Sequence, residues 1–80
     1  MKPKQNRVKA LSENALRQLR QDYPMGARVK CLEMVDESIV RTGDLGNVIT
    51  VDDIGQVHVL WDSGVKLALI PGLDRFNVEE

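Results

Sequence analysis

The sequence has one cysteine, Cys31, and one histidine, His58. A single thiol cannot close an internal disulfide, so the fold has no covalent cross-link of its own, which is typical of a protein kept in the reducing cytoplasm. One cysteine and one histidine also fall short of the four ligands of a structural zinc site. We therefore expect no metal and no cofactor, and a cytoplasmic location.

Long apolar runs and aromatic side chains are equally scarce. No apolar run approaches the roughly 20 residues that cross a bilayer, and no apolar segment follows the basic first ten residues as in a secretory signal. We therefore expect no contact with a membrane. One Trp, one Tyr and one Phe leave no row of aromatic rings for polyproline ligands or for stacked single-stranded bases.

Net charge is almost absent as well, because the 80 residues include 11 basic and 12 acidic side chains. The average hides a division of the chain. Residues 1–30 hold eight basic and two acidic side chains, whereas residues 31–80 hold three basic and ten acidic ones. The sequence therefore predicts one small domain with a basic N-terminal part and an acidic body.

The basic part contains a predicted arm and a predicted helix. Residues 1–10 carry few apolar groups and read as a flexible basic arm. Residues 11–22 predict an amphipathic helix, because Ser12 is a favoured N-cap, Leu11 and Leu16 fit a hydrophobic staple, and Pro24 disfavours helix beyond about residue 22. One helical face carries the apolar side chains Ala15, Leu16, Leu19 and Tyr23.

From residue 23 the apolar pattern changes to alternation interrupted by turns. Strands are predicted over residues 27–34, 47–51, 56–61 and 65–70 and near residues 76–78. Gly64 suits the left-handed position of a three-residue hairpin loop. We expect a mainly β fold, a small five-stranded SH3-like barrel over residues 23–80 preceded by the short helix. Its structural residues are expected to be Leu16, Leu19, Tyr23, Val29, Val48, Val59, Trp61, Gly64 and Phe76.

Two resemblances arise from the motifs of this region. The string GDLGNVITVDDIGQVHVLWDSG, followed by LALIPGLDRF, resembles the bacterial family catalogued as domain of unknown function 4314, which occurs in phages and other mobile elements. That resemblance covers residues 23–78 and leaves the arm and the helix outside. The shorter core, Gly-x-Val and then Val-x-Trp-Asp-x-Gly, is similar to the SH3-like domains of mind-bomb ubiquitin ligases. This similarity implies capture of a peptide from a partner protein.

The side chains that could carry chemistry have a structural interpretation. Asp52, Asp53 and Asp62 stand where turns are predicted, and turns select Asp because its carboxylate caps local backbone amides. His58 alternates with its neighbours, so it should face away from Trp61 as an ordinary strand residue. No Ser, Thr or Cys stands in a recognisable nucleophile motif. We therefore expect no enzymatic activity.

The favoured interpretation is a non-catalytic interaction module that binds a protein partner, as a mobile-element accessory protein that acts on host machinery. The expected contacts lie in the long first loop and on an adjacent strand, at Asp36, Glu37, Ile39, Val40, Arg41 and His58. For Ile39 and Val40 the alternative is that they fold back onto the core. A homodimer is conceivable, because the helix could cover a neighbouring chain instead of its own.

Two other interpretations stay open. The basic side chains Lys2, Lys4, Arg7, Lys9, Arg17 and Arg20 could bind nucleic-acid phosphates, with an affinity that falls steeply as salt is added. Alternatively, the acidic body could act as an inhibitor by mimicking nucleic acid.

Overall fold

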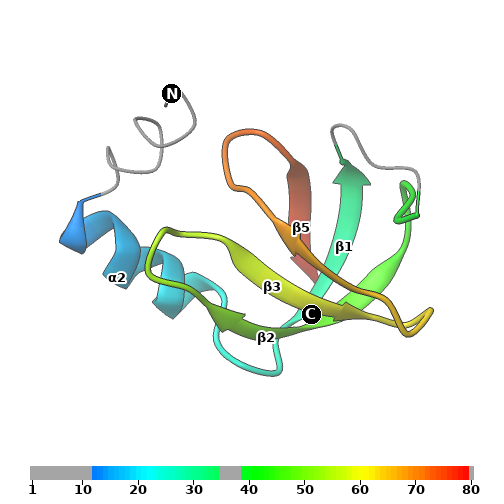
Figure 1. Cartoon of the computed structure of the whole chain (residues 1–80), viewed down its shortest axis with the longest axis horizontal. Helices are drawn as coiled ribbons and strands as arrows, with labels where there is room; N and C mark the ends of the chain where they lie inside the picture. Colours follow the sequence, from blue (N-terminus) through cyan, green and yellow to red (C-terminus); the bar gives the residue numbers. More distant parts are fainter. Residues whose placement is uncertain (1–11, 35–38, 80) are drawn as a thin grey trace.

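A computed structural model describes residues 12–34 and 39–79 (Figure 1). This part of the chain contains one helix followed by five strands, which confirms the mainly β prediction. In chain order the elements are α2 (Glu13–Asp22), β1 (Arg28–Glu33), β2 (Leu45–Val51), β3 (Val57–Trp61), β4 (Lys66–Leu69) and β5 (Arg75–Glu79).

The five strands form one antiparallel sheet in the order β4-β3-β2-β1-β5. The first four strands pair with their neighbours in sequence, and the last returns to lie beside the first. The sheet is strongly curled, so β1 and β5 run across the direction of β2 and β3 (Figure 1). The two strands at its ends are β4 and β5.

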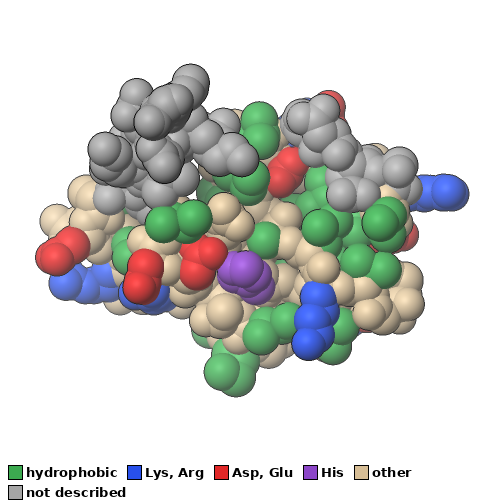
Figure 2. All heavy atoms as spheres, viewed as in Figure 1, with side chains coloured by type: hydrophobic (Ala, Val, Ile, Leu, Met, Phe, Trp, Pro, Cys, Tyr) green, Lys and Arg blue, Asp and Glu red, His purple; other side chains and the backbone are tan. Residues whose placement is uncertain are grey.

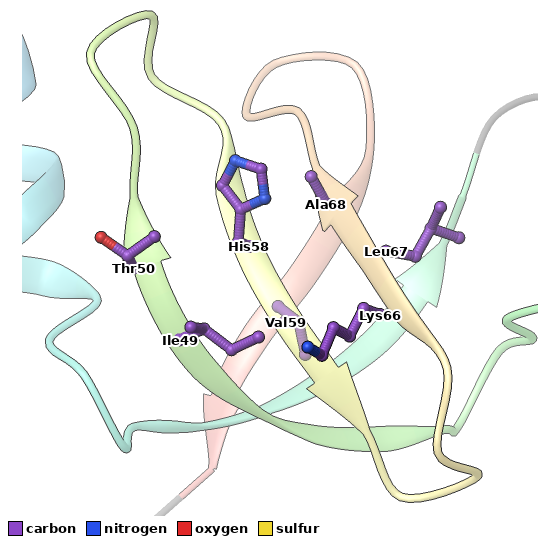
Figure 3. A pocket seen from close by; sticks show the side chains of 7 residues that line it. All are labelled: Ile49, Thr50, His58, Val59, Lys66, Leu67 and Ala68. Atoms are coloured by element: carbon purple, nitrogen blue, oxygen red, sulfur yellow. The ribbon is translucent and has the colours of Figure 1, made fainter.

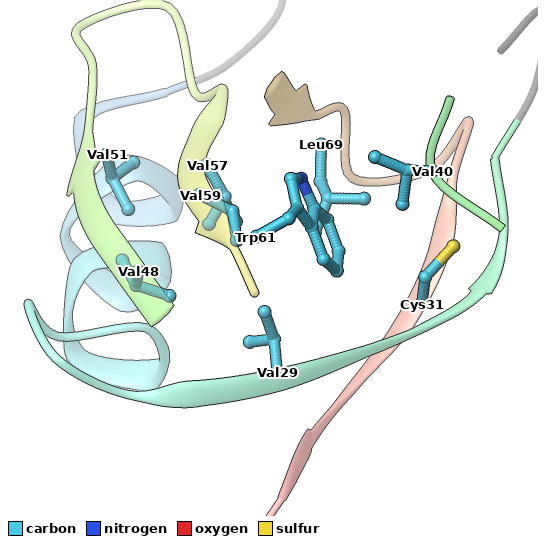
Figure 4. Close-up of a cluster of buried hydrophobic side chains, with 9 residues drawn as sticks. All are labelled: Val29, Cys31, Val40, Val48, Val51, Val57, Val59, Trp61 and Leu69. Carbon is cyan, nitrogen blue, oxygen red and sulfur yellow. The ribbon is translucent and has the colours of Figure 1, made fainter. Parts of the chain in front are cut away.

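The core fills the concave side of this sheet (Figure 4). Trp61 is its largest member and is only 1% exposed. The Trp61 indole Nε1–H donates to the Leu67 carbonyl at 3.1 Å, so the polar atom of the buried ring is satisfied. The predicted core role of Trp61 is therefore confirmed. The other buried hydrophobic residues are Val29, Cys31, Val40, Val48, Val51, Val57, Val59 and Leu69.

Two glycines are required by the geometry of the sheet. Gly64 has a φ of 96° in the loop that joins β3 to β4, which confirms the predicted left-handed position. Gly46 lies in β2, where a Cβ would be 2.6 Å from a methyl carbon of Val59 and 2.9 Å from the Leu60 carbonyl oxygen. Only a residue without a side chain lets β2 and β3 approach so closely at this point.

Helix α2 is short and attached at one side of the sheet. The Ser12 hydroxyl oxygen accepts from the Ala15 N–H at 3.1 Å, and the helix ends at Asp22, as the sequence predicts. Leu11, the other half of the predicted staple, lies outside the described residues. No residue of α2 is fully buried, although Leu16 and Leu19 pack against the core as half-buried side chains.

An aromatic pair joins the end of the helix to the last strand. The rings of Tyr23 and Phe76 lie 5.2 Å apart between centroids, within the range of favourable aromatic contacts. This contact confirms that Tyr23 packs the helix against the sheet. Phe76, one of the predicted structural residues, is half-buried and packs against the core.

Candidate functional site

The outer, convex face of β2, β3 and β4 carries a shallow groove. Alternation along β3 directs Val57, Val59 and Trp61 into the core and turns His58 and Leu60 outward. The outward side chains of the neighbouring strands complete the surface. The groove has a volume of about 460 Å³ and is lined by Ile49, Thr50, His58, Val59, Lys66, Leu67 and Ala68 (Figure 3).

A β-bulge shapes the wall that β2 contributes. The register between β2 and β3 shifts between Val48 and Thr50, so Ile49 is the extra residue of the bulged strand. Ile49 and the long side chain of Lys66 extend toward each other across β3 (Figure 3). Leu60, on the same face, is 40% exposed. The groove thus has apolar walls that water still reaches.

Charged groups are unevenly distributed around this face. Figure 2 views the molecule from this side. Acidic and basic side chains gather at the left, over α2 and the β2–β3 turn, whereas hydrophobic side chains are most numerous to the right of centre, over the sheet. Lys66 is the one cation among the described residues that line the groove.

Asp52 organises the turn beside the groove and holds His58. One Asp52 carboxylate oxygen accepts from the backbone N–H groups of Gln56 (2.8 Å) and Ile54 (3.1 Å). The other lies 2.8 Å from His58 Nε2; because an ionised carboxylate only accepts, Nε2 carries the proton. Burial raises the pKa of Asp52, but the hydrogen bonds from His58, Gln56 and Ile54 outweigh burial, and the pKa is lowered.

The Thr50 hydroxyl and the Cys31 thiol lie in different surroundings. The Thr50 hydroxyl is directed away from the His58 ring (Figure 3), and among the described contacts no hydrogen bond joins the two side chains. Cys31 is buried in the core, and burial, together with Asp44 and Asp74, raises the pKa of its thiol. A thiol in this state is a poor nucleophile.

The structure separates the residues predicted to bind a protein partner. Asp36 and Glu37 lie outside the described residues. Val40 is 2% exposed and belongs to the core, so the fold-back alternative holds for Val40 and removes it from any accessible surface. Ile39 is 58% exposed. His58 lies on the convex face of the sheet, whereas Val40 lies in the core on the concave side, so the structure does not bring these two residues together.

The predicted phosphate-binding residues are likewise divided. Lys2, Lys4, Arg7 and Lys9 lie outside the described residues. Arg20 donates to Asp53 at 2.9 Å and to the Val51 carbonyl at 3.3 Å, so it attaches α2 to the β2–β3 turn. Arg17 contacts only a residue of its own helix, Asn14, at 3.4 Å, among the hydrogen bonds of the described residues.

A third guanidinium is also paired within the fold. Arg28 binds both carboxylate oxygens of Asp62, one of them at 2.7 Å. The hydrogen bond from Arg28 lowers the pKa of Asp62, and the same bond raises the pKa of Arg28. Arg20 and Arg28 therefore do not combine into an uncompensated basic strip.

Comparison with known proteins bears on the whole of the described fold. The family model described as Domain of unknown function (DUF4314) matches residues 12–79. The chain belongs to this family. Its match begins at Ser12, so the DUF4314 domain includes α2, which the motif resemblance leaves outside. No curated protein and no solved structure matches the chain. Within the described ranges, no helix is long and apolar enough to cross a membrane.

Several groove residues of the DUF4314 domain were missed by sequence reasoning. Strand alternation does place Lys66 and Ala68 on the side opposite to Trp61, so the pattern could have identified them. The outward position of Ile49 depends on the bulge, for which the sequence has no clear signal. The pairing of His58 with Asp52 follows from hairpin geometry, because the two residues stand six positions apart on either side of a tight turn.

Proposed function

We propose that this chain is a non-catalytic interaction module that binds a protein partner in the groove on the outer face of β2, β3 and β4. One observation carries the proposal. The apolar side chains of Ile49 and Ala68 line the groove, and Ala68 belongs to β4, an end strand of the sheet. Accessible apolar surface rimmed by polar groups is typical of protein-binding sites.

The finer description of the fold belongs to this proposal. A short, curled antiparallel sheet whose last strand returns to the first supports the SH3-like assignment. The similarity of the Val-x-Trp-Asp-x-Gly core to peptide-capturing domains supports a protein partner. The resemblance to a family of phages and mobile elements supports a cytoplasmic accessory role directed at host machinery.

A peptide-display experiment tests the proposal. Random linear peptides are selected on the full chain, and the amide resonances that shift on peptide binding are mapped. We expect selected peptides to shift Ile49, His58 and Ala68. Ile49→Lys should weaken their binding at least about tenfold, because it places a charge where apolar side chains would be buried.

Leu73→Lys is the matched control. Leu73 is an accessible apolar side chain, 39% exposed, that does not line the groove, so this variant should bind the selected peptides as the wild type does. Failure to select any peptide, or equal losses in the two variants, would contradict the proposal.

A further inference from the structure

The backbone of β4 is available for pairing on its outer side. Among the described residues no strand pairs with that side. The Trp61 N–H donates to the Val65 carbonyl at 2.8 Å, so these two residues form a hydrogen-bonded pair. Such pairs alternate along an antiparallel ladder, and the register then puts Lys66 and Ala68 at the intervening positions. Their N–H and C=O groups therefore point away from β3.

The other end of the sheet is less suited to pairing. The side chains of β5 that share the outer face are Arg75, Asn77 and Glu79. A guanidinium nitrogen of Arg75 also lies 3.9 Å from a carboxylate oxygen of Glu33. Polar and charged side chains along an end strand oppose the addition of another strand. The outer face of β4 carries one charge, Lys66, and the small side chain of Ala68.

Charge and shape at β4 indicate what would fit there. No carboxylate of the described residues pairs with Lys66, which leans over β3 at one end of the groove (Figure 3). Ala68 stands two positions further along and pairs with His58 in register. An added strand would place alternate side chains beside these two positions. A carboxylate complements the first position, and an apolar side chain fills the hollow at the second.

We infer that β4 binds an extended peptide segment of a protein partner as a sixth strand, with an acidic side chain against Lys66 and an apolar side chain two residues away in the hollow beside Ala68. This inference rests on the proposed function and adds the mode of binding. Main-chain hydrogen bonds to an end strand supply affinity, and alternate side chains supply specificity.

An ester scan of the ligand tests the inference without altering the protein. The probe is the tightest synthetic peptide from the display selection, remade with one backbone amide at a time replaced by an ester. In an added strand only every second N–H faces β4. We expect esters at alternate positions to weaken binding about tenfold and those between them to have little effect. Losses without this alternation would overturn the inference.

Protein variants supply an independent readout. Ala68→Pro removes the outward N–H and spares the bonds between β3 and β4, so binding should fall at least about tenfold, whereas Ala68→Ser keeps the N–H and should bind normally. Thermal unfolding shows whether Ala68→Pro remains folded. Lys66→Glu should weaken acidic peptides about fivefold and improve variants in which lysine replaces the acid.

The outcomes separate the inference from the proposed function. If no peptide is selected, the proposed function fails. If peptides bind and shift Ile49 and His58 but the esters show no alternation and Ala68→Pro binds normally, the groove binds protein and strand addition is wrong. Alternating ester losses together with a charge preference that reverses in Lys66→Glu support the sixth strand.

Discussion

At the scale of single residues, Gly46 and Gly64 are positions where the fold requires glycine for two different reasons. Gly64 has open space where a side chain would begin but a φ of 96°, so its requirement is conformational. A Cβ at Gly46 would lie 2.9 Å from backbone atoms of both Leu60 and Trp61, so the requirement there is steric. Asparagine tolerates the left-handed region, whereas every side chain would keep the steric overlap.

We therefore predict different outcomes for two substitutions. Gly46→Ala should lower the free energy of unfolding by about 1–3 kcal/mol, because two of the overlapping atoms belong to the backbone and cannot rotate away. Gly64→Asn should cost less than about 1 kcal/mol. Urea unfolding followed by circular dichroism measures both, and a Gly46→Ala variant as stable as Gly64→Asn would contradict the steric explanation.

The ionisation of Asp52 makes the free energy of unfolding depend on pH. Its carboxylate has a lowered pKa in the folded chain. A lowered pKa means that the folded state binds the proton more weakly than the unfolded state, so the stabilisation is present above the unfolded value of about 3.9 and is lost as pH falls through the folded value.

Asp52→Asn should accordingly reduce the free energy of unfolding by about 1 kcal/mol at neutral pH. The difference from wild type should shrink as pH falls below about 4, because Asp52 is protonated first in the unfolded chain and, at still lower pH, in the folded chain. Glu79→Gln, which removes an exposed carboxylate of β5, is the matched control for the loss of one negative charge. Urea unfolding at pH 7, 5 and 3 measures the effect; a difference that does not depend on pH would refute it.

At the scale of elements, α2 depends on the sheet for its stability. A helix of ten residues is marginal in isolation, and no residue of α2 is fully buried. Its attachment consists of half-buried Leu16 and Leu19, the contact between Tyr23 and Phe76, and the hydrogen bonds of Arg20 to the β2–β3 turn.

Arg20→Gln should therefore loosen α2 while leaving the sheet intact. The exposed ion pair with Asp53 and the bond to Val51 together contribute about 1 kcal/mol, so amide hydrogen exchange in α2 should accelerate about fivefold. Arg17→Gln is the matched control, because Arg17 bonds within its own helix. Equal acceleration in the two variants would show that Arg20 does not attach the helix.

The elements themselves are largely predictable because their signals are local. Ser12 and Pro24 bracket α2 within two residues, and alternation locates every strand. The predicted β2 begins at Asn47, whereas the strand begins at Leu45. Gly46 is a weak strand former in isolation, and its place in the ladder comes from pairing with Val29 and Trp61. Such tertiary pairing overrides local preference and is not visible in the sequence.

At the scale of the whole molecule, the charge division of the sequence does not translate into two separate surfaces in the described fold. Arg20 pairs with Asp53 and Arg28 with Asp62, across 33 and 34 positions of sequence. These pairs join the basic N-terminal part to the acidic body. Which charges meet depends on where α2 packs and how the sheet curls, so counting charges along the chain could not reveal it.

The groove is a property of the whole molecule in the same sense. It needs the order of three strands, the bulge at Ile49 and the outward turn of His58, and only the last follows from local alternation. Sequence reasoning favours the long first loop because loops commonly carry binding residues. The packing of Val40 into the core shows that part of this loop serves the fold.

The chain's one tyrosine and one tryptophan occupy different parts of the structure. Tyr23 caps α2, and Trp61 lies at the centre of the core. The emission of tyrosine responds to its immediate surroundings, and the emission wavelength of tryptophan reports its contact with water. The chain thus carries two intrinsic fluorophores, Tyr23 at the contact between the helix and the sheet and Trp61 in the core, and each reports on its own part of the structure.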